Sequence, residues 1–403
     1  MSAFDREFTA IDAATAARLD YGDEYRALRT AVRRWARERI APELDAWEAA
    51  GRLPRSFFTD AGALGMLGFA VPERYGGPGL RDYRCHAIVV EEIARIGAAS
   101  CAVAVSLQND VVLPYLTDLA SDEQQARWLP GVASGERVLA IAMTEPGAGS
   151  DLAGIRTRAR REGDHYVIDG AKTFVSNGQN ADLFVVAART AAADEAGAAD
   201  RRGGLTLFVV DGRTPGLVRG RNLAKLGLHA QDTSELQFDA MRVPAADRLG
   251  AEGEGFGQLV HHLPQERLSL AAGAVAAAEG VLVYTLEYVR GRTAFGQPLA
   301  KFQNTRFVLA ELATGLDLAR TYLNDCIAEH LRSALTPARA ARLKWWTTEL
   351  QTKVADRCLQ LHGGYGYMRE YRVSRAFADA RIQTIYGGTN EIMKTIVAKD
   401  LDL

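Results

Sequence analysis

The segment Ala142-Met-Thr-Glu-Pro-Gly-Ala-Gly-Ser-Asp151 stands where the chain changes from one kind of hydrophobic periodicity to another. It leaves a short apolar run and turns through small residues, with hydroxyl groups at Thr144 and Ser150. Open backbone amides and hydroxyls of this kind can lie against a planar cofactor, but they also suit a tight turn between two domains. The segment alone leaves both interpretations open.

A second segment, Gly170-Ala-Lys-Thr-Phe-Val-Ser-Asn-Gly178, follows further along the chain. Its alternation places Phe174 and Ser176 on one face of an expected strand, where an aromatic ring and a hydroxyl can pack on a flat ring and bond its edge. By itself the pattern is more typical of a plain strand with a core aromatic.

The chain before these segments is predicted to be helical. Apolar residues recur at helical spacing over about 23–45, and the same period returns over 57–67 and 86–119. Ser121 and Gln124 predict a capping box, and the short helix that it opens is expected to end at Pro130.

The chain between about 138 and 249 changes to short runs rich in β-branched and aromatic residues, separated by Gly, Asn and Asp. This pattern predicts an antiparallel β domain, because no helices alternate with the runs as they do in a parallel βαβ sheet. The small and polar residues over 191–204 predict a solvated loop between two strands. The runs are HYVID, KTFVS, DLFVVAA, LTLFVV, GLVRG and ELQFDAMRV.

Three long helical stretches follow, over about 257–290, 304–332 and 337–361, and they predict an antiparallel bundle. Pro264 lies early in the first stretch and is expected to kink or restart that helix. The predicted fold is therefore α+β. It has an N-terminal helical domain over 1–137, a middle antiparallel β domain over 138–250 and a C-terminal helical bundle over 251–403.

The composition is that of a globular protein with more than one core, since 48% of its 403 residues are hydrophobic and 24% are charged. A net charge of -2 gives no basic field for nucleic acid or an anionic membrane, and we find no apolar run that predicts a membrane span. The four cysteines fit neither a metal knuckle nor a disulfide scaffold, and the N-terminal residues show no secretory pattern. We therefore expect a cytoplasmic protein.

Taken together, TEPGAGSD and the later G-x-K-x-F-V-S-N-G resemble the flavin-binding signatures of the acyl-CoA dehydrogenase family. The resemblance continues at KLGLHAQDTSELQFDAMRVP, GRTAFGQPLAKFQ, QLHGGYGYMREY and IYGGTNEIM, and covers the chain from about Tyr21 to the end. It implies the family fold, a helical domain, a β domain and a C-terminal four-helix bundle, in agreement with the periodicity. It also implies an oxidoreductase that uses FAD to make an α,β-double bond in an acyl thioester.

The resemblance places the family's FAD contacts on particular positions of this sequence. The residues that it implies around the isoalloxazine ring are Met143, Thr144, Ser150, Phe174 and Ser176, with Thr144 and Ser176 donating to the polar edge of the ring. The residues that it implies from a neighbouring subunit are Arg292, Phe295 and Gln303, although Arg292 and Gln303 on their own suit a plain helix surface. The residues that it implies at the adenosine end are Gln360, Gly363 and Gly364, and the further FAD contacts are Thr389 and Glu391. A cofactor shared between chains implies an oligomer, which in this family is usually a homotetramer.

The expected reaction needs a carboxylate that removes the acidic α-proton of the thioester while hydride leaves Cβ for the flavin. Many family members carry this carboxylate in a Y-E-G-T segment near the C-terminus, but the segment here is Tyr386-Gly-Gly-Thr389. The long-chain and isovaleryl branches carry the base in an E-R-L segment on the first bundle helix, and Leu263-Pro-Gln-Glu-Arg-Leu268 matches it. Glu266 is therefore the predicted base, and a solvated or ion-paired position beside Arg267 is the alternative.

Gly387 is expected to act through its backbone N–H, which in the family hydrogen-bonds the thioester carbonyl and stabilises the developing enolate. Burial beside the flavin and the acyl chain is expected to raise the pKa of Glu266. The resemblance implies Ser150, Arg267 and Gly388 as substrate contacts.

Other motifs predict no further site. The stretch GAEGEGFG lacks the spacing and the βαβ setting of a dinucleotide fingerprint. His261 and His262 are adjacent and cannot share one helix face as zinc-binding histidines do, so we expect no metal site. His362 is expected to make a local hydrogen bond.

The expected substrate is an acyl-CoA or an acyl carrier-protein thioester, and the expected electron acceptor is an electron-transfer flavoprotein. The stretches LPQERL and YGGTNEIMK are most similar to the long-chain branch, and the small residues of 98–106 either leave a deep acyl pocket or pack helices closely. A branched acyl group is equally compatible. An oxidase, a monooxygenase or a biosynthetic dehydrogenase on the same fold, and a non-catalytic acyl-thioester-binding protein, remain open alternatives.

Overall fold

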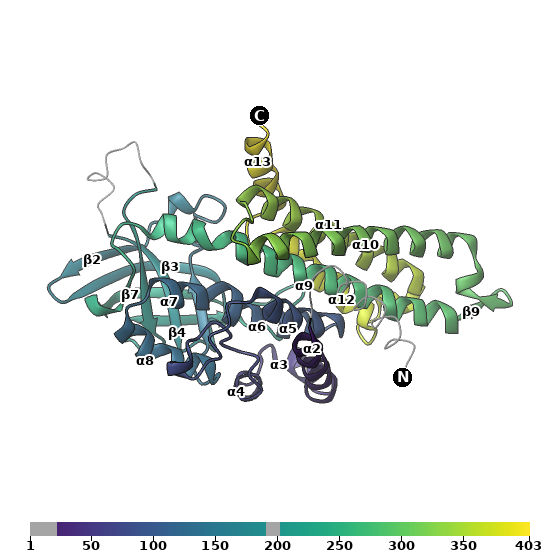
Figure 1. The fold of residues 1–403 in the computed structure, drawn as a ribbon, viewed down its shortest axis with the longest axis horizontal. Coiled ribbons are helices and arrows are strands. Elements are labelled where there is room, and N and C mark those ends of the chain that lie inside the picture. Colours follow the sequence, from purple (N-terminus) through teal and green to yellow (C-terminus); the bar gives the residue numbers. More distant parts are fainter. Residues whose placement is uncertain (1–21, 191–201) are drawn as a thin grey trace.

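The long helix α9 (Gly255–Gly291) connects the parts of the molecule, as Figure 1 shows. The computed structural model describes residues 22–190 and 202–403, so most of the loop predicted over 191–204 lies outside the described residues. The β-sheet lies at one end of the view, the C-terminal helices extend toward the other end, and the N-terminal helices lie beneath (Figure 1). The predicted order of a helical, a β and a second helical part is confirmed.

The N-terminal helices form where apolar residues recur at helical spacing, and they enclose a core that includes Ile40, Phe58 and Ile88. Two short π-helical stretches interrupt the regular helix. In chain order the helical elements of this part are α2 (Asp23–Trp35), π-helix η1 (Ala36–Ile40), α3 (Leu44–Ala50), α4 (Arg55–Ala63), η2 (Glu73–Tyr75), α5 (Tyr83–Arg95), α6 (Ala99–Ser106), π-helix η3 (Leu107–Val112), α7 (Leu113–Leu119) and α8 (Asp122–Ala133).

Helix α8 opens with the predicted capping box, because the Ser121 hydroxyl accepts from the backbone N–H of Gln124 while the Gln124 side chain accepts from the backbone N–H of Ser121. The predicted end of this helix at Pro130 is wrong. Helix α8 continues to Ala133, since a proline removes one backbone donor but its own carbonyl still accepts from Ser134.

The β domain is one eight-stranded sheet in which β1 lies beside β4 and the other strands follow the order β6-β7-β3-β2-β4-β5-β8. Most neighbours are antiparallel, as predicted, but β1 and β2 run parallel to β4. The β2–β3 hairpin reverses the chain once and the connection from β3 to β4 reverses it again, so β4 runs in the direction of β1 and β2. The strands are β1 (Leu139–Ala142), β2 (Arg158–Glu162), β3 (His165–Ser176), β4 (Leu183–Arg189), β5 (Leu205–Asp211), β6 (Leu217–Asn222), β7 (Thr233–Pro244) and β8 (Arg248–Leu249).

The C-terminal helices pack around α9, with α5 of the N-terminal part against another side of the same helix. Helix α9 runs without interruption through Pro264, so the predicted restart of the helix is wrong. The proline removes one backbone donor, but the remaining backbone hydrogen bonds hold the helix. The remaining helices are α10 (Gln303–Leu331), α11 (Pro337–His362), α12 (Arg372–Ala380) and α13 (Asn390–Asp400), with the hairpin of β9 (Thr293–Ala294) and β10 (Gln297–Pro298) between α9 and α10.

Buried ion pairs join α5, α9 and α10. The guanidinium of Arg320 pairs with both Glu91 and Glu279, and that of Arg95 pairs with Glu92 and Glu279 at 2.5 and 3.0 Å. Burial would raise the pKa of Glu91, but Arg320 and two further arginines outweigh it and lower that pKa to about 2. The carboxylate of Glu91 therefore stays charged, and the network fixes how α5 and α10 pack on α9.

Helix α9 is long and apolar enough to cross a membrane by length and composition, contrary to our expectation from the sequence. However, 83% of its most apolar 18-residue window is buried inside the protein. Its apolar character is explained by its position at the centre of the helical packing.

Candidate active site

The two signature segments lie against each other. The buried ammonium of Lys172 on β3 donates to the Met143 carbonyl and to the Glu145 carboxylate, both at 2.9 Å. The backbone N–H of Thr173 donates to the Thr144 carbonyl at 2.9 Å. Burial lowers the pKa of Lys172 to about 8, although Glu145 opposes the shift. These bonds fix Met143 and Thr144 beside the end of β3.

Phe174 occupies an unusual backbone conformation beside this loop. Its φ is 57° at an irregularity in the pairing of β3 with β7, and 68% of its side chain is exposed. Non-glycine residues adopt positive φ rarely, and such strain is often found where a site requires a side chain to point in one direction. Phe174 and Ser176 both line a largely apolar cavity of about 450 Å³, together with Leu226, Ile385 and Tyr386.

Glu266 lies in α9 with only 5% of its surface exposed, so the alternative of a solvated position is wrong. The phenol of Tyr115 on α7 donates to its Oε1 at 3.0 Å. Burial raises the pKa of Glu266 to about 7, with the Tyr115 hydrogen bond and the Arg267 charge opposing the shift. This is the direction expected from the sequence, and it gives a carboxylate that can exchange a proton near neutral pH.

The turn at Gly387 and Gly388 faces the same part of α9. A Cβ placed on Gly387 would lie 2.4 Å from Cδ1 of Leu270, which is four residues beyond Glu266 and therefore on the same helix face. Both glycines have positive φ, of 65° and 91°. Gly387 therefore lies against the face of α9 that also carries Glu266.

Two cations hold this turn. The guanidinium of Arg267 donates to the Gly387 carbonyl at 3.4 Å, and the ammonium of Lys344 on α11 donates to the Gly388 carbonyl at 2.9 Å. Burial lowers the pKa of Lys344 to about 8, and the charge of Arg267 lowers it further. Arg267 and Gly388, both expected substrate contacts, therefore lie together.

The other predicted residues of this region lie on the loop and at a helix start. Ser150 is exposed on the loop between β1 and β2. The hydroxyl of Thr389 accepts from the backbone N–H of Ile392 at 3.3 Å and caps α13, and Glu391 is exposed in the first turn of that helix.

The predicted adenosine-binding residues form a separate cavity of about 540 Å³. Its lining includes Arg292, Gln360, Gly363 and Gly364, and the Arg292 guanidinium lies 5.5 Å from the ring centre of Tyr365. A Cβ on either glycine would meet nothing within 4 Å, so the backbone of this turn is open to a ligand.

Phe295 and Gln303 line neither of these two cavities. Phe295 lies at the tip of the β9–β10 hairpin with 96% of its side chain exposed, and Gln303 is exposed at the start of α10. Strand β3 and strand β9 lie at opposite ends of the view in Figure 1. The residues predicted to bind one FAD therefore form two groups that are well separated within one chain.

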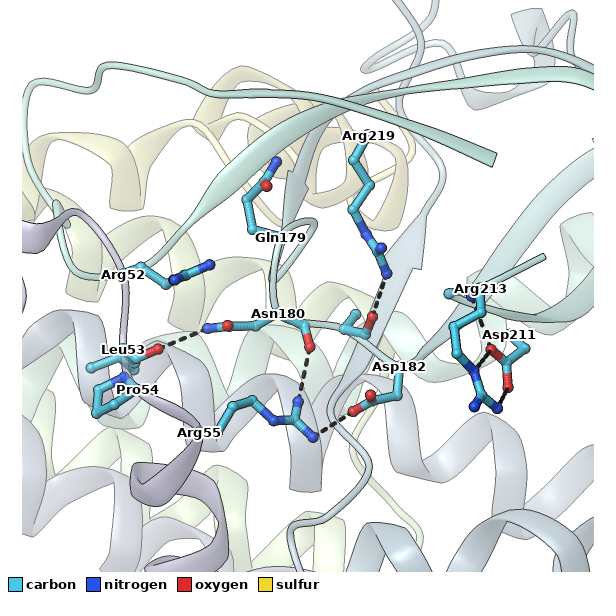
Figure 2. Close-up of a pocket in the computed structure, with 12 residues that line it drawn as sticks. Arg52, Leu53, Pro54, Arg55, Gln179, Asn180, Asp182, Asp211, Arg213 and Arg219 are labelled. Atoms are coloured by element: carbon cyan, nitrogen blue, oxygen red, sulfur yellow. Dashed lines mark hydrogen bonds and ion pairs between the residues drawn. The ribbon is translucent and has the colours of Figure 1, made fainter. Parts of the chain in front are cut away.

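A further cavity of about 380 Å³ lies where the segment before α4 meets the sheet (Figure 2). Although arginines line it, Arg55 donates to the Asn180 carbonyl and to Asp182, and Arg219 donates to a backbone carbonyl of the same turn. These bonds join the N-terminal helices to the sheet, so we assign the cavity a structural role.

Several residues of the site carried no signal in the sequence. Tyr115 lies within a long helical pattern, and Lys172 and Lys344 look like ordinary polar positions of a strand and a helix. Their partners are distant in sequence, so only the tertiary structure shows the contacts. His362 makes the expected local bond, between its Nδ1 and the Cys358 carbonyl at 2.9 Å.

Comparisons with known proteins place these features in a family. The acyl-CoA dehydrogenase N-terminal, middle and C-terminal domain profiles match residues 22–136, 140–241 and 253–401. The chain is 42% identical to the mitochondrial long-chain specific acyl-CoA dehydrogenase of Sus scrofa over 94% of this chain and 87% of the relative. An acyl-CoA dehydrogenase from Geobacillus kaustophilus superposes with a TM-score of 0.91 at 44% identity, over 95% of this chain and 99% of that chain.

A glutaryl-CoA dehydrogenase from Mycobacterium smegmatis, solved in complex with FADH2, superposes with a TM-score of 0.87 at 29% identity, over 94% of this chain and 95% of that chain. The matches extend along all three parts of the molecule. The chain belongs to the acyl-CoA dehydrogenase family of FAD-dependent oxidoreductases.

Proposed function

We propose that this enzyme dehydrogenates long-chain acyl-CoA thioesters and that Glu266 removes the α-proton. The observation that carries the proposal is the burial of Glu266 opposite Gly387, in the region where other branches of the family place their base. A carboxylate with a pKa of about 7 is matched to proton removal at neutral pH.

The turn at Gly387 supplies the second element of the mechanism. Its backbone N–H would donate to the thioester carbonyl and stabilise the negative charge that develops when the α-proton leaves. Arg267 and Lys344 donate to the carbonyls of Gly387 and Gly388, which orients the turn before the substrate binds. The bound FAD supplies the electron sink that accepts hydride from Cβ.

The described residues fit FAD at both of its ends. The strained Phe174 and the half-buried Ser176 line an apolar cavity that suits a flat ring, with Thr144 next to them. The open glycine turn and Arg292 suit the adenosine and the pyrophosphate.

The separation of these two groups supports an oligomer in which each FAD contacts two chains. Phe295 at the hairpin tip is 96% exposed within one chain, which leaves it accessible to a neighbouring chain. We therefore propose a homotetramer, with an electron-transfer flavoprotein as the electron acceptor.

The acyl chain is proposed to run along α9. Small residues of α6 and α9, including Ala99, Ala102, Gly273 and Ala277, line a narrow cavity next to Leu270. Ala277 lies 11 residues beyond Glu266 (277 minus 266), which is about 16 Å along a helix at 1.5 Å per residue. The volume of this cavity is about 20 Å³, so binding of a long chain there requires its lining side chains to move apart. The similarity to a long-chain specific relative supports this substrate class.

The proposal is tested by anaerobic titration of the flavin with acyl-CoA thioesters of increasing length. Wild type is expected to bleach most completely with long chains, whereas Glu266→Gln should keep its flavin and fail to bleach. Glu287→Gln, an exposed position on the same helix, is the matched control and should behave like wild type.

Equal bleaching of wild type and Glu266→Gln would show that the base lies elsewhere. If wild type binds FAD but no CoA thioester bleaches it, the enzyme acts on a carrier-protein thioester or is not catalytic. Formation of peroxide in air by the reduced enzyme would identify an oxidase.

A further inference from the structure

We propose that Tyr115 is the positioning residue of the base, holding Oε1 of Glu266 so that Oε2 is presented to the α-proton. This inference rests on the proposed function of Glu266. The Tyr115 hydroxyl lies 3.0 Å from Oε1 of Glu266, and both side chains are buried. Within residues 22–190 and 202–403, this is the one hydrogen bond that the Glu266 carboxylate accepts.

The ring of Tyr115 is itself held in place. Its centre lies 4.3 Å from that of His262, which is one turn before Glu266 on α9. Burial lowers the pKa of His262 to about 4, so this imidazole is neutral at physiological pH and packs as an uncharged ring. Helix α9 thus contacts Tyr115 at both its ring and its hydroxyl.

The segment that carries Tyr115 is attached to α9 at further polar contacts. The side chain of Gln265 donates to the Asp110 carbonyl at 3.0 Å, and the Ser269 hydroxyl donates to the Asp110 carboxylate. Asp110 belongs to the π-helix η3 directly before α7, and its other carboxylate oxygen bonds His86 at 2.6 Å. Gln265 and Ser269 therefore fix the η3–α7 segment on α9, and His262 packs on the Tyr115 ring. The direction of the phenol is thus determined by contacts on both sides of Glu266.

Within residues 22–190 and 202–403, two charged or titratable groups act on the pKa of Glu266, and a third lies behind the Tyr115 ring. Tyr115 approaches it from α7, Arg267 follows it on α9, and His262 reaches it only through the Tyr115 ring. Burial, and next the charge of Glu266, raise the pKa of Tyr115 well above its usual value, so the phenol remains a donor throughout the reaction. A fixed donor on Oε1 stabilises the carboxylate and leaves the other oxygen to accept the proton.

The test compares Tyr115→Phe, which removes only the hydroxyl, with Tyr166→Phe as a matched control. Tyr166 is equally buried and also donates to a glutamate, Glu252, at 2.7 Å, but it lies in the β domain. The rate of flavin bleaching by a long-chain acyl-CoA is measured against pH for wild type, both variants and Glu266→Gln.

We expect the acid limb of the pH–rate profile of Tyr115→Phe to lie about one pH unit higher than that of wild type, because the lost hydrogen bond favoured the charged form of Glu266. At pH values below this limb, the bleaching rate of Tyr115→Phe should be about tenfold lower than that of wild type. The profile of Tyr166→Phe should match that of wild type. Infrared titration of the protonated carboxyl band in flavin-free protein should show the same shift and does not depend on turnover.

Two outcomes separate the inference from the proposed function. If Glu266→Gln is inactive while Tyr115→Phe keeps the wild-type pH profile and carboxyl titration, the positioning role is wrong and the base assignment stands. If Glu266→Gln bleaches as fast as wild type, the proposed function itself is wrong.

Discussion

The carboxylate of Glu266 makes the stability of the protein depend on pH. Its folded pKa of about 7 lies above the usual value of 4.5, so the folded state holds this proton more tightly than the unfolded chain. The resulting stabilisation is fully present below pH 4.5 and is lost as the pH rises to 7. The shift of about 2.5 units corresponds to roughly 3 kcal/mol.

We expect Glu266→Gln to be about as stable as wild type at pH 4.5 and more stable at pH 8, by up to about 3 kcal/mol. Chemical denaturation of the two flavin-free proteins across this pH range measures the difference. A constant difference across the range would mean that Glu266 is not shifted.

Gly387 is a second residue whose replacement has a clear expected cost. An alanine there must adopt a φ of 65° and place its Cβ 2.4 Å from Leu270. The backbone term alone is about 1–2 kcal/mol. Gly387→Ala should therefore lower the free energy of unfolding by at least this amount. In the Leu270→Ala background the same substitution should cost less, because the clash is absent. If Gly387→Ala costs the same in both backgrounds, the cost is purely that of the backbone.

At this scale the sequence predicted Glu266 and Gly387 through a family resemblance, but it did not predict Tyr115. A tyrosine in a helical pattern carries no local sign of which distant carboxylate it meets. The same holds for Lys344, whose partner is a backbone carbonyl 44 positions away. Hydrogen bonds between segments far apart in the chain depend on how the helices and strands pack. Hydrophobic periodicity predicts these elements, but it does not predict which of them contact one another.

Among the elements, the junction of β3 with the loop after β1 depends on one buried ion pair. Lys172 and Glu145 are 1% and 7% exposed, and Lys172 also bonds the Met143 carbonyl. Lys172→Met would leave the Glu145 carboxylate buried without its cationic partner, although the backbone N–H groups of Arg156 and Thr157 would still donate to it. Breaking a buried pair in this way typically costs about 3–5 kcal/mol.

We expect Lys172→Met to lose that stability and to retain FAD poorly, because the loop would no longer be fixed beside Phe174. The double variant with Glu145→Gln should recover much of the stability, since no unpaired charge remains. Thermal unfolding and the ratio of flavin to protein distinguish these cases. Full flavin retention by the single variant would contradict the role given to the pair.

The elements themselves were largely predictable. The helical stretch expected over 304–332 is observed as Gln303–Leu331, and that expected over 337–361 as Pro337–His362. The errors are of two kinds. Pro130 and Pro264 lie inside continuous helices, because the remaining backbone hydrogen bonds of those helices hold without the missing donor. The parallel pairing of β4 with β1 joins segments far apart in the chain, which local patterns do not predict.

At the scale of the whole molecule, the two groups of cofactor-binding residues lie far apart in one chain. Phe174 lies in the sheet, whereas Arg292 lies next to the β9 hairpin at the other end of α9 (Figure 1). If each FAD contacts two chains, then each chain completes the site of a neighbour. The catalytic unit would then be larger than the folded unit.

This separation has a consequence for inheritance. Glu266→Gln and Arg292→Ala damage opposite halves of the shared site, so each variant is expected to be inactive in an assembly of its own kind. In a mixed assembly, a chain with an intact base can meet a neighbour with an intact arginine. Co-expression of the two defective alleles is thus expected to restore part of the activity, and two alleles damaged at the same half should not complement each other.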